Sequence, residues 1–167
     1  MQTFVPYPDL VATARALDDR RLGKQRVETM QILRALTREK YGWKHHPAVK
    51  MWRGFEPALV VYGRVICEEW RRRGHADTCE ATILADAAEA GIDVTKTVLR
   101  RRGGVVPRGV AFPPWWGDDA VHESHRASLL RKDPDHYRPI FGDGTPDDLP
   151  YVWPTNASPA GDGRGAR

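Results

Sequence analysis

The sequence predicts a compact, all-α, single-domain fold with few or no strands. Its 167 residues suffice for one domain with its own hydrophobic core. A composition of 41% hydrophobic and 29% charged residues is typical of chains that fold alone. Apolar residues also recur at three- and four-residue intervals, the period of an amphipathic helix. We therefore expect one helical domain over residues 1–153 and an unstructured Gly/Ser/Pro-rich tail over 154–167.

The first expected helix begins after an aspartate, whose carboxylate can accept the free N–H groups of the first turn. Asp9 caps a short helix that ends near Leu17. After a second acidic pair, a long amphipathic helix follows from Arg20 to about Lys40. Gly23 inside it costs about 1 kcal/mol relative to alanine. It indicates either the close approach of a ligand or another backbone, or ordinary helix packing.

The remaining helices follow from proline, glycine and aspartate signals. Pro47 suits the first turn of a helix, and Gly74 and Gly91 suit the positions just past helix ends. Between residues 95 and 114 we expect a short helix ending in the Arg100–Gly104 run, then an exposed connector without strands. The other helices are expected over 56–73, 78–90, from Asp118 or Asp119 to about Leu130, and from Asp133-Pro134 through Phe141.

Charge and cysteine content limit the possible functions. Net charge is only +4, because 26 Lys and Arg are offset by 22 Asp and Glu, so a basic surface must arise from local clustering. Cys67 and Cys79 have no CxxC spacing, and no secretory signal opens the chain, so we expect a reducing cytoplasm. The longest apolar run, residues 58–62, is far shorter than the roughly 20 residues that cross a bilayer.

The densest cationic segment spans residues 20–28. Arg20, Arg21, Lys24 and Arg26 lie within seven residues, and cations so closely spaced on a helix repel one another unless an anion, such as phosphate, binds them. The alternative is a solvated helix face paired with neighbouring carboxylates. Glu28, one turn after Lys24, is either a general acid or base or the partner of Lys24 in a surface ion pair.

Aromatic and histidine residues form a second candidate site. The loop Trp43-Lys44-His45-His46 combines a ring that can stack on an unpaired base with groups that can contact phosphate. Together with His122 and His125 it could instead bind a metal, but no acidic or cysteine pattern completes a zinc site. We therefore expect no metal. Arg71 and Arg72, in a run that continues to Arg73, and the run Arg100–Arg102 are further candidate phosphate contacts.

These motifs resemble the pyrimidine-dimer DNA glycosylases of the phage endonuclease V type and their small bacterial relatives. The resemblance spans about residues 1–141. It rests on the 20–28 helix, the 43–49 loop, the helix ending at 68–74 and the segment 122–137. It is closest to bacterial proteins that share Leu22-Gly23-Lys24-Gln25-Arg26 and Lys132-Asp133-Pro134.

The resemblance implies an all-helical fold and a specific chemistry. In the phage enzymes the N-terminal α-amine attacks the sugar of a damaged nucleotide and forms a Schiff base, a helix glutamate assists, and arginines bind the phosphates. On this sequence it implies the amine of Met1 and Glu28, with Lys24 as the alternative nucleophile. An α-amine pKa of about 8 leaves a usable neutral fraction near pH 7. The phage enzymes place glutamate directly after arginine. Here Val27 intervenes, and the aligned position could also be Arg21.

We therefore expect a DNA glycosylase, with or without abasic-site lyase activity, that acts on damaged or modified bases in double-stranded DNA. We expect a cytoplasmic, nucleoid-associated monomer that uses no cofactor and contacts no membrane. The expected DNA contacts are Arg20, Arg21, Arg26, Trp43, Lys44, His45, His46, Arg71 and Arg72. Two alternatives stay open: a non-catalytic nucleic-acid-binding module of the same fold, and a helical enzyme acting on nucleotides or phosphorylated metabolites.

Overall fold

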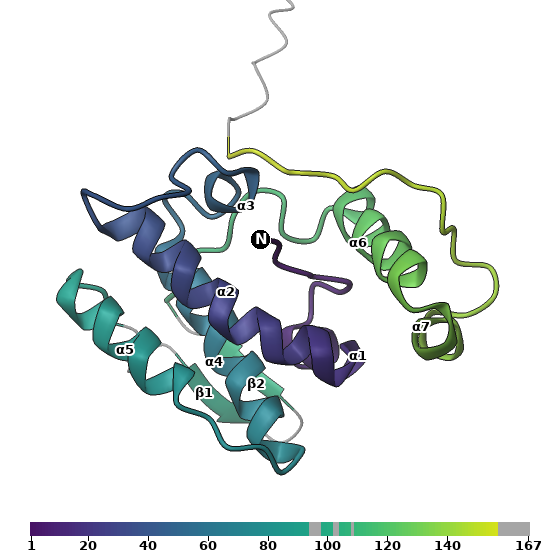
Figure 1. Ribbon diagram of the computed structural model, residues 1–167, viewed down its shortest axis with the longest axis horizontal. Coiled ribbons are helices and arrows are strands. Elements are labelled where there is room, and N and C mark those ends of the chain that lie inside the picture. Colours follow the sequence, from purple (N-terminus) through teal and green to yellow (C-terminus); the bar gives the residue numbers. More distant parts are fainter. Residues whose placement is uncertain (94–97, 102–103, 108, 157–167) are drawn as a thin grey trace, which may run out of the picture.

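The computed structural model describes residues 1–93, 98–101, 104–107 and 109–156. These residues form seven helices and one two-stranded hairpin (Figure 1), which confirms the predicted all-α class with few strands. None of the helices in these ranges is long and apolar enough to cross a membrane. The helices are α1 (Leu10–Ala16), α2 (Asp19–Thr37), α3 (Pro47–Lys50), α4 (Glu56–Arg72), α5 (Cys79–Glu89), α6 (Asp119–Lys132) and α7 (Pro134–Phe141).

Aspartate side chains cap several of these helices, and the caps of α1 and α6 were predicted. The side chain of Asp9 accepts a hydrogen bond from the amide of Ala12 at the start of α1. Asp18 likewise caps α2, and Asp118 caps α6. Each cap satisfies an N–H group that has no partner within the helix. The positive φ values of Gly74 and Gly91 confirm the predicted ends of α4 and α5.

The segment after α5 differs from the prediction. In place of the expected short helix, β1 (Val98–Arg101) pairs antiparallel with β2 (Gly104–Pro107), and Arg101 lies opposite Gly104. The sequence carried the signal for this hairpin, because valine and leucine favour strands and a Gly-Gly pair at 103–104 favours a tight turn. Residues 94–97, 102–103 and 108, part of the expected helix and connector, lie outside the described residues.

Two glycines allow α2 and α4 to pack closely. A Cβ on Gly63 of α4 would lie 2.5 Å from the Cγ2 atom of Thr29 on α2, closer than packed atoms come. A Cβ on Gly23 of α2 would lie 3.2 Å from the ring of Trp70. Gly23 is therefore explained by helix packing, one of the two predicted alternatives.

The N-terminal residues lie in the middle of the fold. Figure 1 shows the chain starting between α2, α3 and α6, and Thr3, Phe4 and Val5 are buried. The C-terminal segment runs from α7 back over α6 toward α3 (yellow in Figure 1). There Pro154 is buried, and Asn156 donates to the carbonyls of Met51 and Arg53 at 3.1 and 2.8 Å. The rest of the predicted unstructured tail, residues 157–167, lies outside the described residues.

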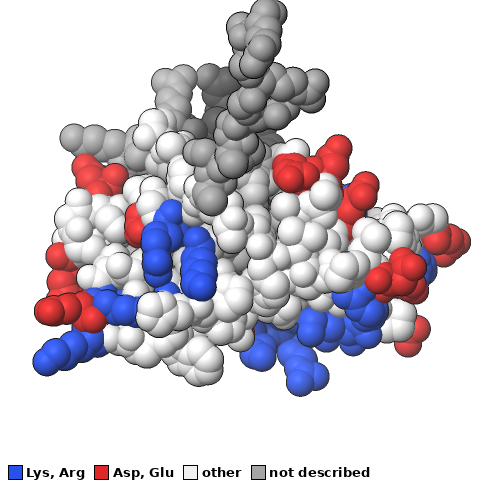
Figure 2. Space-filling model, turned by 90° about the horizontal axis from the view of Figure 1, so that it is seen from above, with Lys and Arg blue, Asp and Glu red and all other residues white. Residues whose placement is uncertain are grey.

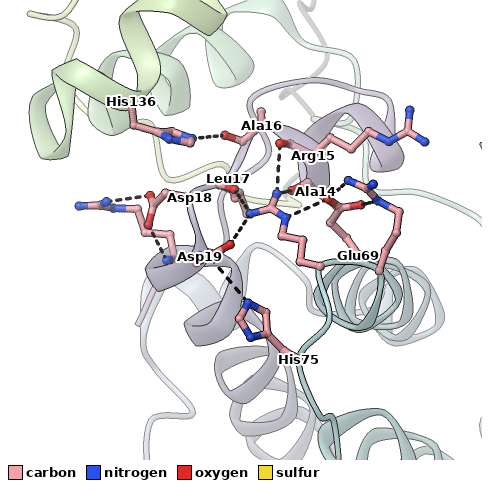
Figure 3. A network of polar contacts seen from close by, with 12 residues as sticks. Ala14, Arg15, Ala16, Leu17, Asp18, Asp19, Glu69, His75 and His136 are labelled. Atoms are coloured by element: carbon pink, nitrogen blue, oxygen red, sulfur yellow. Dashed lines mark hydrogen bonds and ion pairs between the residues drawn. The ribbon is translucent and has the colours of Figure 1, made fainter.

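A polar network joins the end of α4 to the connection between α1 and α2 (Figure 3). Arg73 donates to the carbonyl of Leu17 and to the carboxylate of Asp19, both at 2.8 Å, and to the buried carboxylate of Glu69 at 2.9 Å. Its guanidinium thus satisfies carbonyls at the end of α1, where a cation is favoured by the helix dipole. His136 lies 3.1 Å from the carbonyl of Ala16. The network fixes where α2 begins.

Candidate active site

The N-terminal segment is hydrogen-bonded to α6. Val5 donates its amide to Nδ1 of His125 at 3.0 Å, and its carbonyl lies 2.7 Å from Nδ1 of His122. Arg126 donates to the carbonyl of Pro6 at 2.6 Å. Since Nδ1 of His125 accepts a hydrogen bond, this ring is neutral, and burial lowers its pKa to about 3. The two histidines therefore anchor the N-terminal segment.

Side chains of helices α2 and α4 form hydrogen bonds with Phe4 of the N-terminal segment. The amide of Phe4 donates to Oε1 of Gln25 at 2.9 Å, and the hydroxyl of Tyr62 lies 2.8 Å from the same oxygen and 3.0 Å from the Phe4 carbonyl. On the other side, Trp52 donates to the hydroxyl of Thr3 at 2.9 Å. Residues 3–6 are thus hydrogen-bonded from several directions, which fixes the direction in which the first two residues point.

The side chain of Glu28 lies close to the first two residues of the chain. Its Oε2 atom accepts a hydrogen bond from the side-chain amide of Gln25 at 2.9 Å and a longer one from the backbone amide of Gln2 at 3.4 Å. The amine of Met1 is no more than about 4 Å along the backbone from that amide. It therefore lies within roughly 7 Å of the carboxylate. The carboxylate also contributes, after burial, to the raised pKa of Tyr62 and of Tyr151.

A small pocket opens at this point. It has a volume of about 160 Å³ and shares its lining with a wider, more open hollow of about 450 Å³ on the outer face of α2. Arg20, Lys24 and Glu28 line both. The smaller pocket is completed by Gln2, Phe4, Arg21, Gln25 and Lys132. The wider hollow is completed by Asp19, Gly23, Val27, Gln31 and Trp70.

Three of the cations that line the smaller pocket form no ion pair with another described residue. Within the described part of the chain, no ion pair of 4 Å or less includes Arg20, Lys24 or Lys132. Glu28 accepts from two amides and not from Lys24, so the predicted Lys24–Glu28 ion pair is not formed. A pocket whose cations are unpaired favours an anionic ligand, and phosphate is the common biological one.

The other two arginines of the predicted cluster are engaged within the protein. Arg21 donates to the carboxylate of Asp18 at 2.7 Å and, more weakly, to the carbonyl of Lys132 at 3.3 Å, although it also lines the pocket. Arg26 pairs with Asp77, and its guanidinium lies 4.3 Å from the ring centre of Trp70. Arg26 therefore does not line the pocket that Arg20, Arg21 and Lys24 share.

The predicted contacts at the end of α4 also carry partners. Arg71 pairs with Glu80 and lies 3.4 Å from Asp77. Arg72 donates twice to Glu69, at 2.6 and 2.7 Å, while its side chain stays 60% exposed. In Figure 2, the lysines and arginines of one face form separate groups, with most acidic side chains toward the margins. Basic surface on this face is therefore local, as the low net charge predicted.

The loop before α3 lies on another side of the N-terminus. Trp43 is 64% exposed and has a φ of +69°, a left-handed backbone that a tryptophan rarely adopts. Its ring packs edge-on against His46, which caps α3. Burial and the positive charge of the N-terminal amine lower the pKa of His46, which places its ring near the amine. His45 is exposed and Lys44 half-buried.

The structure adds residues that the sequence did not single out. Gln25 and Tyr62 hold the N-terminal segment and Glu28, yet Tyr62 lies 58 positions from Phe4. His122 and His125 were considered only as metal ligands. No group of three or more His, Cys, Asp or Glu in the described ranges could hold a metal ion. No sequence pattern relates residues that lie so far apart in the chain. The spacing of Gln25 on α2, in contrast, matches the face of the helix that is buried.

The fold and this site define a small all-helical protein that presents its N-terminal residues to a carboxylate inside a cation-lined pocket. The sequence model of one family, described as pyrimidine dimer DNA glycosylase, matches residues 1–83. The match covers the N-terminal segment, α2, α3 and α4, and confirms over these residues the family that the sequence resembles. No curated protein and no solved structure matches the chain.

Proposed function

We propose that the protein is a DNA glycosylase that removes damaged or modified bases from double-stranded DNA. The observation that carries the proposal is the contact of the Gln2 amide with Oε2 of Glu28 inside a pocket lined by Arg20, Lys24 and Lys132. A covalent base-excision enzyme needs a nucleophile, an acid or base and phosphate contacts within one site. The match of residues 1–83 to the glycosylase family supports the same assignment.

In the proposed reaction the neutral amine of Met1 attacks C1′ of the sugar. The bond between C1′ and the base breaks, the base leaves with the electron pair and a proton, and the sugar ring opens to a Schiff base. Glu28 moves the protons that these steps require. Loss of a C2′ proton then expels the 3′ phosphate, which is the lyase step. Lys24, in the same pocket, is the alternative nucleophile.

The phosphates would contact Arg20 and Lys24, and also Arg21, which lines the pocket although it is paired with Asp18. Arg26, Arg71 and Arg72 are weaker candidates because carboxylates engage them outside the pocket. Trp43 would stack on an unpaired base, with the loop residues Lys44, His45 and His46 nearby. The exposure and rare backbone conformation of Trp43 support this role. Such a protein would act as a monomer on the nucleoid.

Borohydride trapping on duplexes that contain an abasic site or a pyrimidine dimer tests the proposal. The wild-type protein should form a covalent adduct. Acetylation of the amine should abolish the adduct, whereas Lys24→Arg, which keeps the charge but cannot form a Schiff base at neutral pH, should retain it. Binding without an adduct or base release on any lesion would instead indicate a non-catalytic DNA-binding module.

A further inference from the structure

The side chain of Gln25 forms hydrogen bonds with both the N-terminal segment, at Phe4, and the carboxylate of Glu28. We propose that Gln25 is a positioning residue that holds the carboxylate of Glu28 at a fixed separation from the N-terminal amine. The inference rests on the proposed function. Gln25 is 1% exposed, so it acts through its neighbours and does not itself contact DNA.

The partners of Gln25 determine the orientation of its amide. The backbone amide of Phe4 can only donate, so the atom 2.9 Å from it is the oxygen. The group 2.9 Å from Oε2 of Glu28 is then the nitrogen, which donates to the carboxylate. The hydroxyl of Tyr62 lies 2.8 Å from the oxygen. A flip of the amide would place its nitrogen against the N–H donor of Phe4 and its oxygen against the carboxylate of Glu28, so it is excluded.

Helix geometry makes this bridge rigid. Gln25 and Glu28 are three positions apart on α2, so they lie on the same face. Thr29 donates its hydroxyl to the backbone carbonyl of Gln25 at 2.7 Å, one turn further along. A change in the Gln25 rotamer would break its contacts to Phe4 and to Glu28 at once. Leaving a buried polar group without a partner costs free energy, so the two contacts stabilise the same rotamer of Gln25.

The bridge also supplies a hydrogen-bond donor to the carboxylate of Glu28. A hydrogen bond donated to a carboxylate oxygen stabilises the charged group, and an acceptor in the same place would destabilise it. Gln25→Glu separates the two functions of the side chain. The new carboxylate can still accept from Phe4 and Tyr62, but it cannot donate to Glu28, and it places a second negative charge beside it.

The experiment compares the wild-type protein, Gln25→Glu and the control Ala85→Glu, which adds the same charge at an exposed position of α5. NMR titration of the labelled side-chain carboxylates gives the midpoint of Glu28. In Gln25→Glu this midpoint should rise by about one pH unit or more, because a like charge lies next to it. The rate of borohydride-trapped adduct on abasic duplex should fall at least about tenfold. In the control Ala85→Glu, the midpoint of Glu28, the adduct rate and the duplex affinity should all match those of the wild-type protein.

An unchanged Glu28 midpoint together with an unchanged adduct rate in Gln25→Glu would overturn the positioning role. A wild-type protein that forms no adduct and releases no base would overturn the proposed function, while the carboxylate titration would still decide whether Gln25 holds Glu28. If Gln25→Glu does not fold, the wild-type protein provides the test. Its Gln25 side-chain amide signal should shift with the midpoint of Glu28, and an insensitive signal would refute the contact.

Discussion

The backbone amide of Gln2 lies 3.4 Å from Oε2 of Glu28, across 26 residues of sequence. The distance is long for a hydrogen bond between these atoms, so this contact alone would not hold the N-terminus in place. The position depends instead on buried hydrogen bonds at Phe4 and Val5. Those bonds direct the first two residues toward the carboxylate of Glu28.

Glu28→Gln should abolish most turnover and preserve DNA binding. The amide keeps the size of the side chain but cannot accept a proton, and general acid–base catalysis contributes about 10²–10⁴-fold to rate. Single-turnover cleavage of a lesion-containing duplex and a binding isotherm measure the two effects. Glu39→Gln, at an exposed position after α2, is the control. Unchanged turnover in Glu28→Gln would exclude Glu28 from the reaction.

Arg20→Ala should weaken DNA binding, whereas Arg26→Ala should mainly lower the stability of the fold. Arg20 is exposed and unpaired, so its loss should weaken binding to any duplex and reduce the slope of log affinity against log salt by about 1. Arg26 pairs with Asp77, whose side chain is 1% exposed. Its loss should lower the free energy of unfolding by about 2–4 kcal/mol. Salt titrations and urea denaturation of both variants measure this. Equal salt slopes in the two variants would contradict it.

Acidification should weaken the anchoring of the N-terminal segment. The pKa of His125 is lowered to about 3, and that of His122 is also lowered, in both cases first by burial. In the unfolded chain each is about 6.5. The unfolded state therefore binds more protons as pH falls below about 6.5, so stability that is present above this pH is lost progressively toward pH 3. Each histidine contributes at most about 1.4 kcal/mol per pH unit.

The effect can be tested between about pH 5.5 and 6.5, because the lowered carboxylate pKa values of Asp18, Glu69 and Asp77 act mainly at lower pH. His125→Gln can still accept from Val5 but does not titrate, so it should flatten the dependence of unfolding free energy on pH. His45→Gln, at an exposed histidine, should leave the dependence unchanged. The same slope in His125→Gln and wild type would contradict the anchor.

Gly63→Ala should destabilise the fold by about 1–3 kcal/mol, because the new methyl group overlaps Thr29 of the facing helix. Thr29→Ser removes the methyl that it meets and keeps the hydroxyl that donates to Gln25. The double variant should therefore recover part of the loss. Gly42→Ala, with open space around the position, is the control. Additive effects of the two substitutions would contradict the close approach of α2 and α4.

Local signals predicted most of the fold. Asp9 and Asp118 act as caps, and Gly74 and Gly91 end their helices, because caps and helix ends depend on residues within one turn. The hairpin at 98–107 was missed because arginines that suit a helix end outweighed its valines and Gly-Gly pair. The position of Asn156 depends on its hydrogen bonds to Met51 and Arg53, just after α3, and no local sequence pattern reports such contacts.

The candidate site was predicted only in part. Charge spacing identified Arg20 and Lys24, and the resemblance identified Glu28, which the structure places beside the N-terminus. Whether a cation is free depends on carboxylates elsewhere in the chain, so the pairing of Arg26 with Asp77, 51 positions away, was not visible. The anchoring of Val5 by His125 spans 120 positions. Only folding brings such partners together.

The central claim is that the N-terminal amine, held beside Glu28, forms the covalent bond to DNA. Mass-spectrometric mapping of the borohydride-reduced adduct on an abasic duplex tests it most directly, with the intact mass of the free protein confirming Met1 as the first residue. We expect the sugar remnant on the amine of Met1. An adduct on Lys24 or another lysine, with the Met1 amine unmodified, would contradict it.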